Sequence, residues 1–169
     1  MIMEYFILSQ DQRMLHTVTI KDMSTIRGYH DSMGYDSSQL PPMSVAFINS
    51  RRDTVYTDLL DRQMFLISDN LRELFHLVDP EITYKHCCLL DRENDVHTFY
   101  HIPSLHVASD VAITRTEMVV FGKNAKLKHI FTDEKRSKLI VSLLVAESIM
   151  RRALVGIKLD RLSLRNSAN

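Results

Sequence analysis

The stretch NLRELFHLVDPEITYKHCCLLDRENDVHTFYHI, residues 70–102, decides the fold class because its apolar pattern changes from a helical period to a strand period. In its first part, apolar residues recur at i, i+3, i+4 and i+7, which is one face of a helix: Leu71, Leu74, Phe75 and Val78. Asn70 and Glu73 have the spacing of a capping box, and Asp79-Pro80 supplies a stop signal. The pattern therefore predicts a helix over 71–78.

The second part of this stretch predicts a β-hairpin. Two strand-like runs, 82–90 and 96–102, are separated by the polar turn 91–95. With a turn centred near Asn94, the alternation of side chains puts five residues on one sheet face: His86, Cys88, His97, Phe99 and His101.

Towards the N-terminus, the sequence predicts less regular structure. Residues 5–8 form a strand, and the alternating run 15–20 is its expected hairpin partner. Periodicity then disappears, so we expect residues 20–62 to form a long irregular excursion with one short strand at 44–48. A short buried strand at 63–67 leads into the helix.

Towards the C-terminus, strand and helix signals follow in turn. We expect a strand at 118–121, a pair of strands at 129–132 and 138–141, and a closing strand at 157–164. Ser142 caps a second helix, 143–154, and Gly156 ends it. On that helix the expected buried stripe comprises Leu143, Ala146, Met150 and Ala153, widened by Ile149 and Leu154.

Because strands and helices do not alternate regularly, we expect an α+β fold. Its sheet is mostly antiparallel, with two main helices packed on one side. The length of 169 residues fits a single domain over 1–169.

Charge and composition exclude several classes of protein. The 21 Lys and Arg residues balance 21 Asp and Glu residues, which argues against a basic nucleic-acid binder and against an acidic DNA mimic. No apolar run approaches the roughly 18 residues that cross a bilayer, and the N-terminus has no signal-peptide pattern. We therefore expect a cytoplasmic protein with no membrane or nucleic-acid partner. Cys87 and Cys88 are adjacent, so on a strand they point to opposite faces and form no disulfide with each other.

Motifs for cofactors and catalysis are absent from the sequence. It contains no glycine-rich phosphate loop, no His-Glu-x-x-His and no Cys-x-x-Cys, so we expect no cofactor and no enzymatic activity. The alternative is a small hydrolase, dependent on a metal or a thiol, that uses one sheet face: His86, Cys88, His97 and His101. The competing interpretation of these residues is partly exposed histidines and a small buried cysteine.

Four stretches carry a resemblance to a known family: YFILSQDQR (5–13), FLISDNLRELFHLVDPEI (65–82), CCLLDRENDVHTFYHIP (87–103) and LIVSLLVAESIMRRALVGIKLDRLSL (139–164). In this order they resemble the bacterial immunity-protein family eleven, formerly a domain of unknown function. The resemblance covers residues 3–19 and 63–164. It implies an α+β protein without catalytic residues that protects its producer by binding and blocking a cognate toxin.

The segment between the two resembling parts is our predicted toxin interface. Irregular segments with tyrosine and arginine are typical of interface anchors, and the candidates are Tyr29, Tyr35, Arg51, Arg52 and Tyr56. An ordinary surface loop is the alternative. The expected partner is the toxin, with self-association into a homo-oligomer left open. A structural component of a secretion-associated complex is a third possibility, and it would self-associate stably without binding a toxin.

Overall fold

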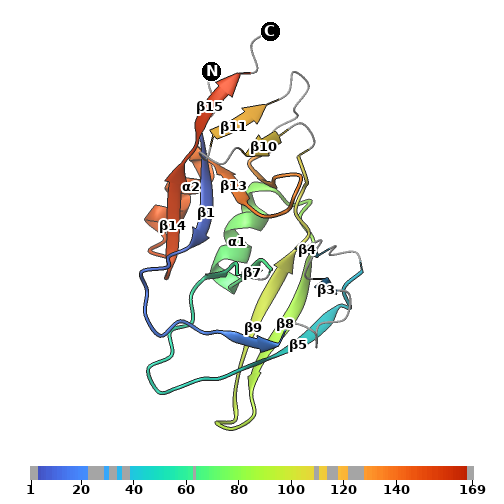
Figure 1. The fold of residues 1–169 in the computed structure, drawn as a ribbon, viewed down its shortest axis with the longest axis vertical. Coiled ribbons are helices and arrows are strands. Elements are labelled where there is room, and N and C mark those ends of the chain that lie inside the picture. Colours follow the sequence, from blue (N-terminus) through green and yellow to red (C-terminus); the bar gives the residue numbers. More distant parts are fainter. Residues whose placement is uncertain are drawn as a thin grey trace.

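The computed structural model describes residues 4–22, 29–30, 34–35, 39–62, 64–108, 111–113, 118–121 and 128–166. Over these residues the fold is α+β, as predicted, with two helices and mostly antiparallel strands (Figure 1). Helix α1 spans Asp69–Val78 and helix α2 spans Leu143–Arg151. The strands do not form one sheet, however, because they separate into two main sheets and two small ones.

The largest sheet has six strands in the order β2-β5-β8-β9-β7-β6. Their bounds are β2 Ile20–Asp22, β5 Met43–Ile48, β6 Leu59–Leu60, β7 Leu66–Ile67, β8 Tyr84–Asp91 and β9 Val96–Pro103. β5 pairs with β8 in parallel, and the other neighbours are antiparallel. A parallel bridge between Thr17 and Val55 joins the segments that precede the two edge strands β2 and β6.

The second main sheet has four strands in the order β12-β13-β1-β14. Their bounds are β1 Tyr5–Gln10, β12 Ile130–Thr132, β13 Leu139–Ser142 and β14 Ile157–Arg161. The two small sheets contain β10 Val111–Ile113, β11 Met118–Phe121 and β15 Ser163–Asn166, and the pair β3 Tyr29–His30 and β4 Gly34–Tyr35.

The predicted hairpin is confirmed, and its register is the one expected for a turn near Asn94. Asp91 pairs with Val96 at the turn, and His86 pairs with His101 further along. The predicted first helix is confirmed too, but its cap is not Asn70. The N-cap is Ser68, whose hydroxyl accepts a hydrogen bond from the backbone N–H of Leu71.

The predicted N-terminal hairpin is wrong. β1 lies between β13 and β14, both distant in sequence, and residues 15–19 lie outside the strands, with Leu15 exposed. The predicted irregular excursion, 20–62, is also wrong in part. It includes the expected strand as β5, but it also supplies β2 and β6, the two edges of the six-stranded sheet. β2 pairs with β5 far along the chain, where local periodicity gives no signal, and β6, with two residues, is too short to show a period.

The second helix and the last strand differ from prediction in extent. α2 ends at Arg151, three residues before the predicted end, and its buried residues are Val145, Ala146 and Ile149. Leu143 and Met150 of the predicted stripe are exposed. The predicted closing strand divides into β14 and β15, which belong to different sheets.

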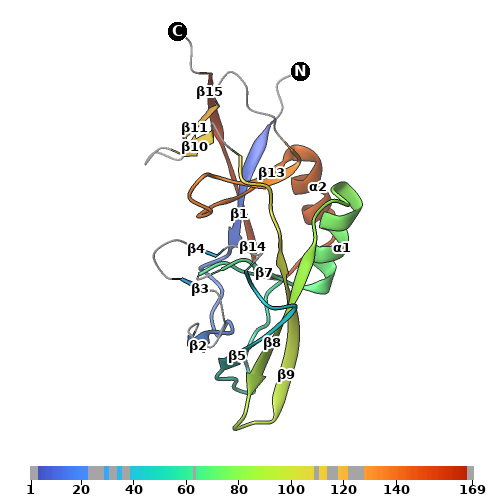
Figure 2. The same ribbon diagram turned by 90° about the vertical axis from the view of Figure 1, so that its right-hand side faces the viewer.

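One continuous apolar core joins the two main sheets. It includes Leu8 and Leu139 of the four-stranded sheet together with Ile48 and Leu89 of the six-stranded sheet. The helices pack against each other on one side of the molecule, as predicted (Figure 2). No helix among the described residues is long and apolar enough to cross a membrane. Both cysteines are free, and they lie on opposite faces of β8, with Cys87 buried and Cys88 half-buried.

Candidate functional site

The three central strands of the six-stranded sheet present an ordered outer face. β5, β8 and β9 lie side by side (Figure 1), and their register aligns outward side chains in rows of three. The alternate residues, such as Ala46, Leu89 and Tyr100, point into the core. We call the outward set the outer-face grid. Its rows are Met43, His86 and His101; Val45, Cys88 and Phe99; and Phe47, Leu90 and His97.

The outer-face grid exposes large apolar side chains. Met43 and Phe99 are each 49% exposed, and Val45 is 39% exposed. Cys88 between them is half-buried, so the middle row is apolar from one strand to the next. At the end of the grid, the guanidinium of Arg92 lies 4.2 Å above the centre of the Phe47 ring. The result is a contiguous apolar strip with a cationic border.

The first row ends in two histidines, of which His101 is buried and His86 is exposed. His101 is 6% exposed, and its Nε2 lies 2.8 Å from Oδ1 of Asp69, the first residue of α1. The ring of His86, directly opposite on β8, lies 5.1 Å from the His101 ring between centroids. Burial lowers the pKa of His101, and this effect exceeds the opposing influence of Asp69. The imidazole is therefore neutral at pH 7.

The structure brings together only part of the predicted metal or thiol site. His86, Cys88, His97 and His101 do share one face, as the sequence predicted. His97, however, lies four residues from His101 on the same strand, which corresponds to roughly 13 Å. That distance is too long for a shared zinc ion. Among the residues that the structure describes, no three His, Cys, Asp or Glu side chains are grouped so that they could hold a metal ion.

Cys87, the other cysteine of β8, is a core side chain. Cys87 is fully buried, and burial raises its pKa to about 12. A thiol with this pKa stays protonated at neutral pH and is a poor nucleophile.

A serine and a histidine also meet in the four-stranded sheet. Oγ of Ser142, the N-cap residue of α2, lies 2.9 Å from Nδ1 of His129. The Ser142 hydroxyl therefore makes no capping hydrogen bond to the helix. Because Ser142 is only 3% exposed, a substrate has no access to its hydroxyl. We interpret the pair as a link between the segment before β12 and the start of α2.

Of the five predicted interface residues, the structure describes the side chains of Arg51, Arg52 and Tyr56. The backbones of Tyr29 and Tyr35 pair directly in the β3–β4 sheet, and their side chains lie outside the described part of the structure. Tyr56 is half-buried and packs against the main core. Arg51 and Arg52 are exposed.

The loop that carries Arg51 and Arg52 lies at the same end of the sheet as the β8–β9 turn. Nδ2 of Asn94 in that turn donates a hydrogen bond to the carbonyl oxygen of Ser50 at 3.0 Å. The two arginines therefore lie at the end of the sheet where the last row of the outer-face grid is found.

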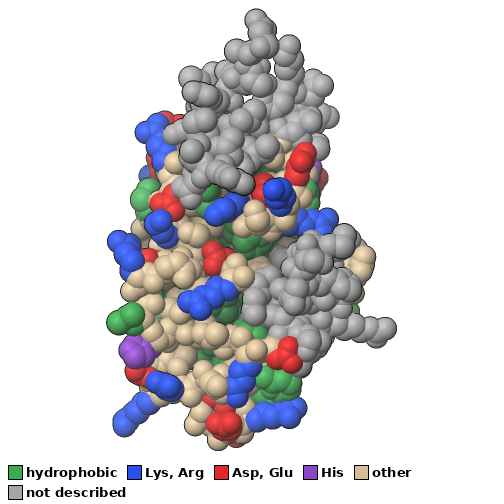
Figure 3. Space-filling model, in the orientation of Figure 1, with side chains coloured by type: hydrophobic (Ala, Val, Ile, Leu, Met, Phe, Trp, Pro, Cys, Tyr) green, Lys and Arg blue, Asp and Glu red, His purple; other side chains and the backbone are tan. Residues whose placement is uncertain are grey.

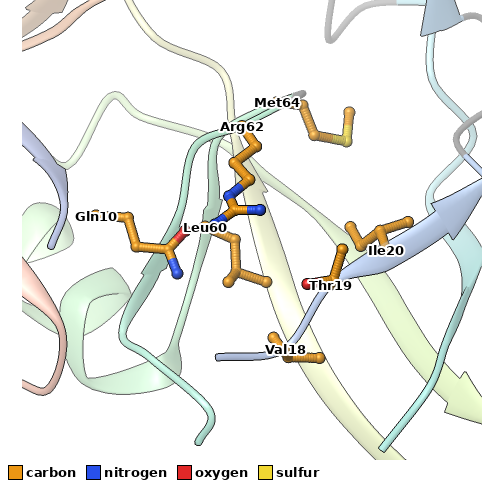
Figure 4. Close-up of a pocket in the computed structure, with 7 residues that line it drawn as sticks. All are labelled: Gln10, Val18, Thr19, Ile20, Leu60, Arg62 and Met64. Atoms are coloured by element: carbon orange, nitrogen blue, oxygen red, sulfur yellow. The ribbon is translucent and has the colours of Figure 1, made fainter. Parts of the chain in front are cut away.

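A half-open cavity of about 190 Å³ lies at the seam between the two edges of the six-stranded sheet (Figure 4). Gln10, Leu60 and Arg62 lie on one side of the opening, and residues 18–20 lie on the other. Met64 completes the lining. The lining combines apolar side chains with the polar groups of Gln10, Thr19 and Arg62. The volume exceeds that of the roughly 150 Å³ cavities that bind benzene.

Charged side chains of both signs are mixed over the face of the molecule that Figure 3 shows. The described part of this face therefore carries both positive and negative side chains, as the neutral composition of the sequence leads us to expect.

In comparisons with known proteins, no protein-family model and no curated protein matches the chain. The resemblance to immunity family eleven therefore stays a prediction, and the geometry of the molecule carries the functional argument.

Proposed function

We propose that this chain is an immunity protein, which acts in the cytoplasm and neutralises a cognate toxin by protein–protein contact. The observation that supports this proposal is the apolar strip of the outer-face grid, where Met43 and Val45 on β5 and Phe99 on β9 are exposed on either side of half-buried Cys88. Contiguous apolar patches are uncommon on soluble monomers, and they mark interaction sites.

The surroundings of the strip have the composition of an interface. Protein interfaces combine an apolar centre, in which an aromatic residue often dominates the binding energy, with a polar rim. Phe99 supplies the aromatic side chain at the centre. Arg92, His97 and the Arg51-Arg52 loop supply polar groups at one end. The position of Arg51 and Arg52, two of the five interface residues expected from the sequence, at this end of the sheet supports the proposal.

Binding to such a surface needs shape and polar complementarity but no reaction machinery. The sheet forms a rigid base for this surface, because on each strand the strip residues alternate with core residues that anchor the strand. A partner would meet a preformed surface, which limits the entropy lost on association.

The test is binding and rescue with the toxin encoded by the neighbouring reading frame. We expect the purified chain to bind this toxin and to restore growth of cells that express it. Phe99→Ala should weaken binding by about 30-fold, the effect of losing a central aromatic anchor worth about 2 kcal/mol. Affinity is measured by isothermal titration calorimetry and rescue by growth.

Leu144→Ala is the matched control, because Leu144 is an equally exposed apolar residue (54%) on α2, away from the strip. We expect it to change the affinity less than twofold. Absence of both binding and rescue, with expression confirmed, would overturn the proposal. Equal losses in the two variants would show that the strip is not the contact surface.

A further inference from the structure

We propose that His86 and His101 form a binding site for one divalent transition-metal ion of the class that prefers imidazole ligands, such as Zn²⁺ or Ni²⁺. The site lies in the first row of the outer-face grid, where α1 meets the β8–β9 hairpin. The inference does not depend on the proposed function, because it rests on the geometry of two side chains and their neighbours.

The separation of the two rings fits a metal ion bound between them. His86 and His101 are directly opposite on antiparallel strands, with ring centroids 5.1 Å apart. A metal ion that lies about 2.0–2.1 Å from one nitrogen of each ring, at a near-tetrahedral angle, holds the two centroids about 5 Å apart. Rotation of the exposed His86 ring therefore creates the site, while the His101 ring keeps its contact with Asp69 and the strands need not move.

The hydrogen bonding of His101 leaves one ring nitrogen available to a metal ion. Nε2 faces the Asp69 carboxylate at 2.8 Å, so in the neutral ring this nitrogen carries the proton and donates it. Nδ1 is buried and has no hydrogen-bond partner. The tautomer follows from the hydrogen-bond network, and it leaves a lone pair on the buried nitrogen. A buried acceptor without a donor is costly, and a bound cation satisfies it.

The Asp69 carboxylate has the position of a group that supports a metal-binding histidine. Histidines that ligate metals nearly always donate their other ring N–H to a carboxylate, a carbonyl or water, which fixes the ring and strengthens the ligand. Asp69 has this position, and it is itself held by Nε of Arg72 at 3.1 Å. Asp69 lies there because it begins α1, directly after β7, which pairs with β9 at His101.

The open side of the site faces solvent. His86 is exposed, so water can fill the remaining coordination positions, as it does in metal sites that keep open positions. Two imidazole ligands favour zinc, nickel and copper over magnesium and calcium, which prefer oxygen ligands.

The experiment is isothermal titration of ZnSO₄ and NiCl₂ into the purified chain at pH 7.5. A Cys88→Ser background removes the half-buried thiol on the same face, so that imidazole binding alone is measured. We expect one equivalent of metal per chain, with MgCl₂ giving no binding. His86→Ala, at an exposed position where folding is not at risk, should weaken binding at least tenfold.

His97→Ala is the matched control, because His97 is exposed on the same face of the same sheet but lies beyond the reach of the pair. It should change the affinity less than twofold. Asp69→Asn should weaken binding at least tenfold, as losses of carboxylates behind a ligand do. No binding by the parent chain, or equal losses in His86→Ala and His97→Ala, would overturn the proposal.

Discussion

Gly156 occupies a position between α2 and β14 that only glycine fits. Its φ is +71°, in the left-handed region that residues with a side chain rarely adopt. A Cβ atom at this position would lie 2.3 Å from Cγ2 of Thr57, which is itself buried. The backbone is also held in place, since the carbonyl oxygen of Gly156 accepts a hydrogen bond from the N–H of Asp11 at 2.9 Å.

We therefore expect Gly156→Ala to lower the free energy of unfolding by about 2–4 kcal/mol, from backbone strain together with overpacking. The measurement is urea unfolding followed by circular dichroism. Ala153→Gly is the control, because Ala153 also has positive φ (49°) but is exposed. That change should stay within about 1 kcal/mol of the wild type. An equal effect of both substitutions would show that the contact with Thr57 is unimportant.

Asp91 makes the stability of the hairpin end dependent on pH. Its buried carboxylate accepts hydrogen bonds from the hydroxyl and N–H of Ser50, both at 2.6 Å, and from Nδ2 of Asn94 at 2.8 Å. These bonds hold the pKa of Asp91 well below its usual range. In the unfolded chain the pKa is about 3.9, so the unfolded state binds more protons as the pH falls below about 4. The stabilisation is present above that pH and is lost below it.

We expect the wild type to lose stability between about pH 4 and pH 2, and Asp91→Asn to lose less over the same range while being less stable at pH 7. Urea unfolding at pH 7, 4, 3 and 2 measures both effects. The exposed Asp95 in the same turn provides the control, since asparagine also tolerates its positive φ of 52°. The same pH slope in the wild type and in Asp91→Asn would contradict the assignment.

Among the elements, the sequence predicted best those whose partners are close along the chain. α1 and the β8–β9 hairpin follow from local periodicity, and so does the shared face of His86, Cys88 and His101. The start of α1 was harder to predict, because Ser68, Asp69 and Asn70 are all good capping residues. A tertiary contact favours Ser68, whose hydroxyl donates a hydrogen bond to the carboxylate of Asp58.

This contact predicts different effects for two neighbouring substitutions. Ser68→Ala removes the cap of α1 and leaves the buried Asp58 with one donor fewer, so we expect a loss of about 1–2 kcal/mol in unfolding free energy. Asn70→Ala should be neutral or slightly stabilising, because Asn70 is exposed inside the helix and alanine is the better helix former. Thermal and urea unfolding test both. A larger loss in Asn70→Ala than in Ser68→Ala would show that Asn70 caps α1.

The part of the outer-face grid that the sequence did not predict depends on distant pairing. The outer-face grid needs β5 beside β8, and this parallel pair joins residues about 40 positions apart, such as Val45 and Cys88. Exposed Met43 and Val45 have no local signal that separates them from core residues of the same type. The buried face of α2 was predicted only in part, because an apolar helix offers several possible stripes. Ala146 and Ile149 are buried as predicted, whereas Val145 was missed and Met150 is exposed.

At the scale of the whole molecule, the two main sheets share one core, and this makes the site dependent on distant residues. Leu8 of β1 is 1% exposed and belongs to the same apolar cluster as Leu89 and Ile102, which lie under the outer-face grid. A domain with one continuous core unfolds as a unit. A cavity in the four-stranded sheet should therefore weaken the six-stranded sheet as well.

We expect Leu8→Ala to lower the free energy of unfolding by about 2–5 kcal/mol, the range for a buried leucine. Hydrogen exchange should lose protection by the same free energy in β1, β13, β8 and β9, because their most protected amides exchange through global unfolding. Mass spectrometry of exchanged peptides resolves these strands, and exposed Leu144→Ala should leave all of them unchanged. If β8 and β9 kept wild-type protection while β1 and β13 lost theirs, the chain would contain two independent units. The outer-face grid would then be a surface that the six-stranded sheet supports by itself.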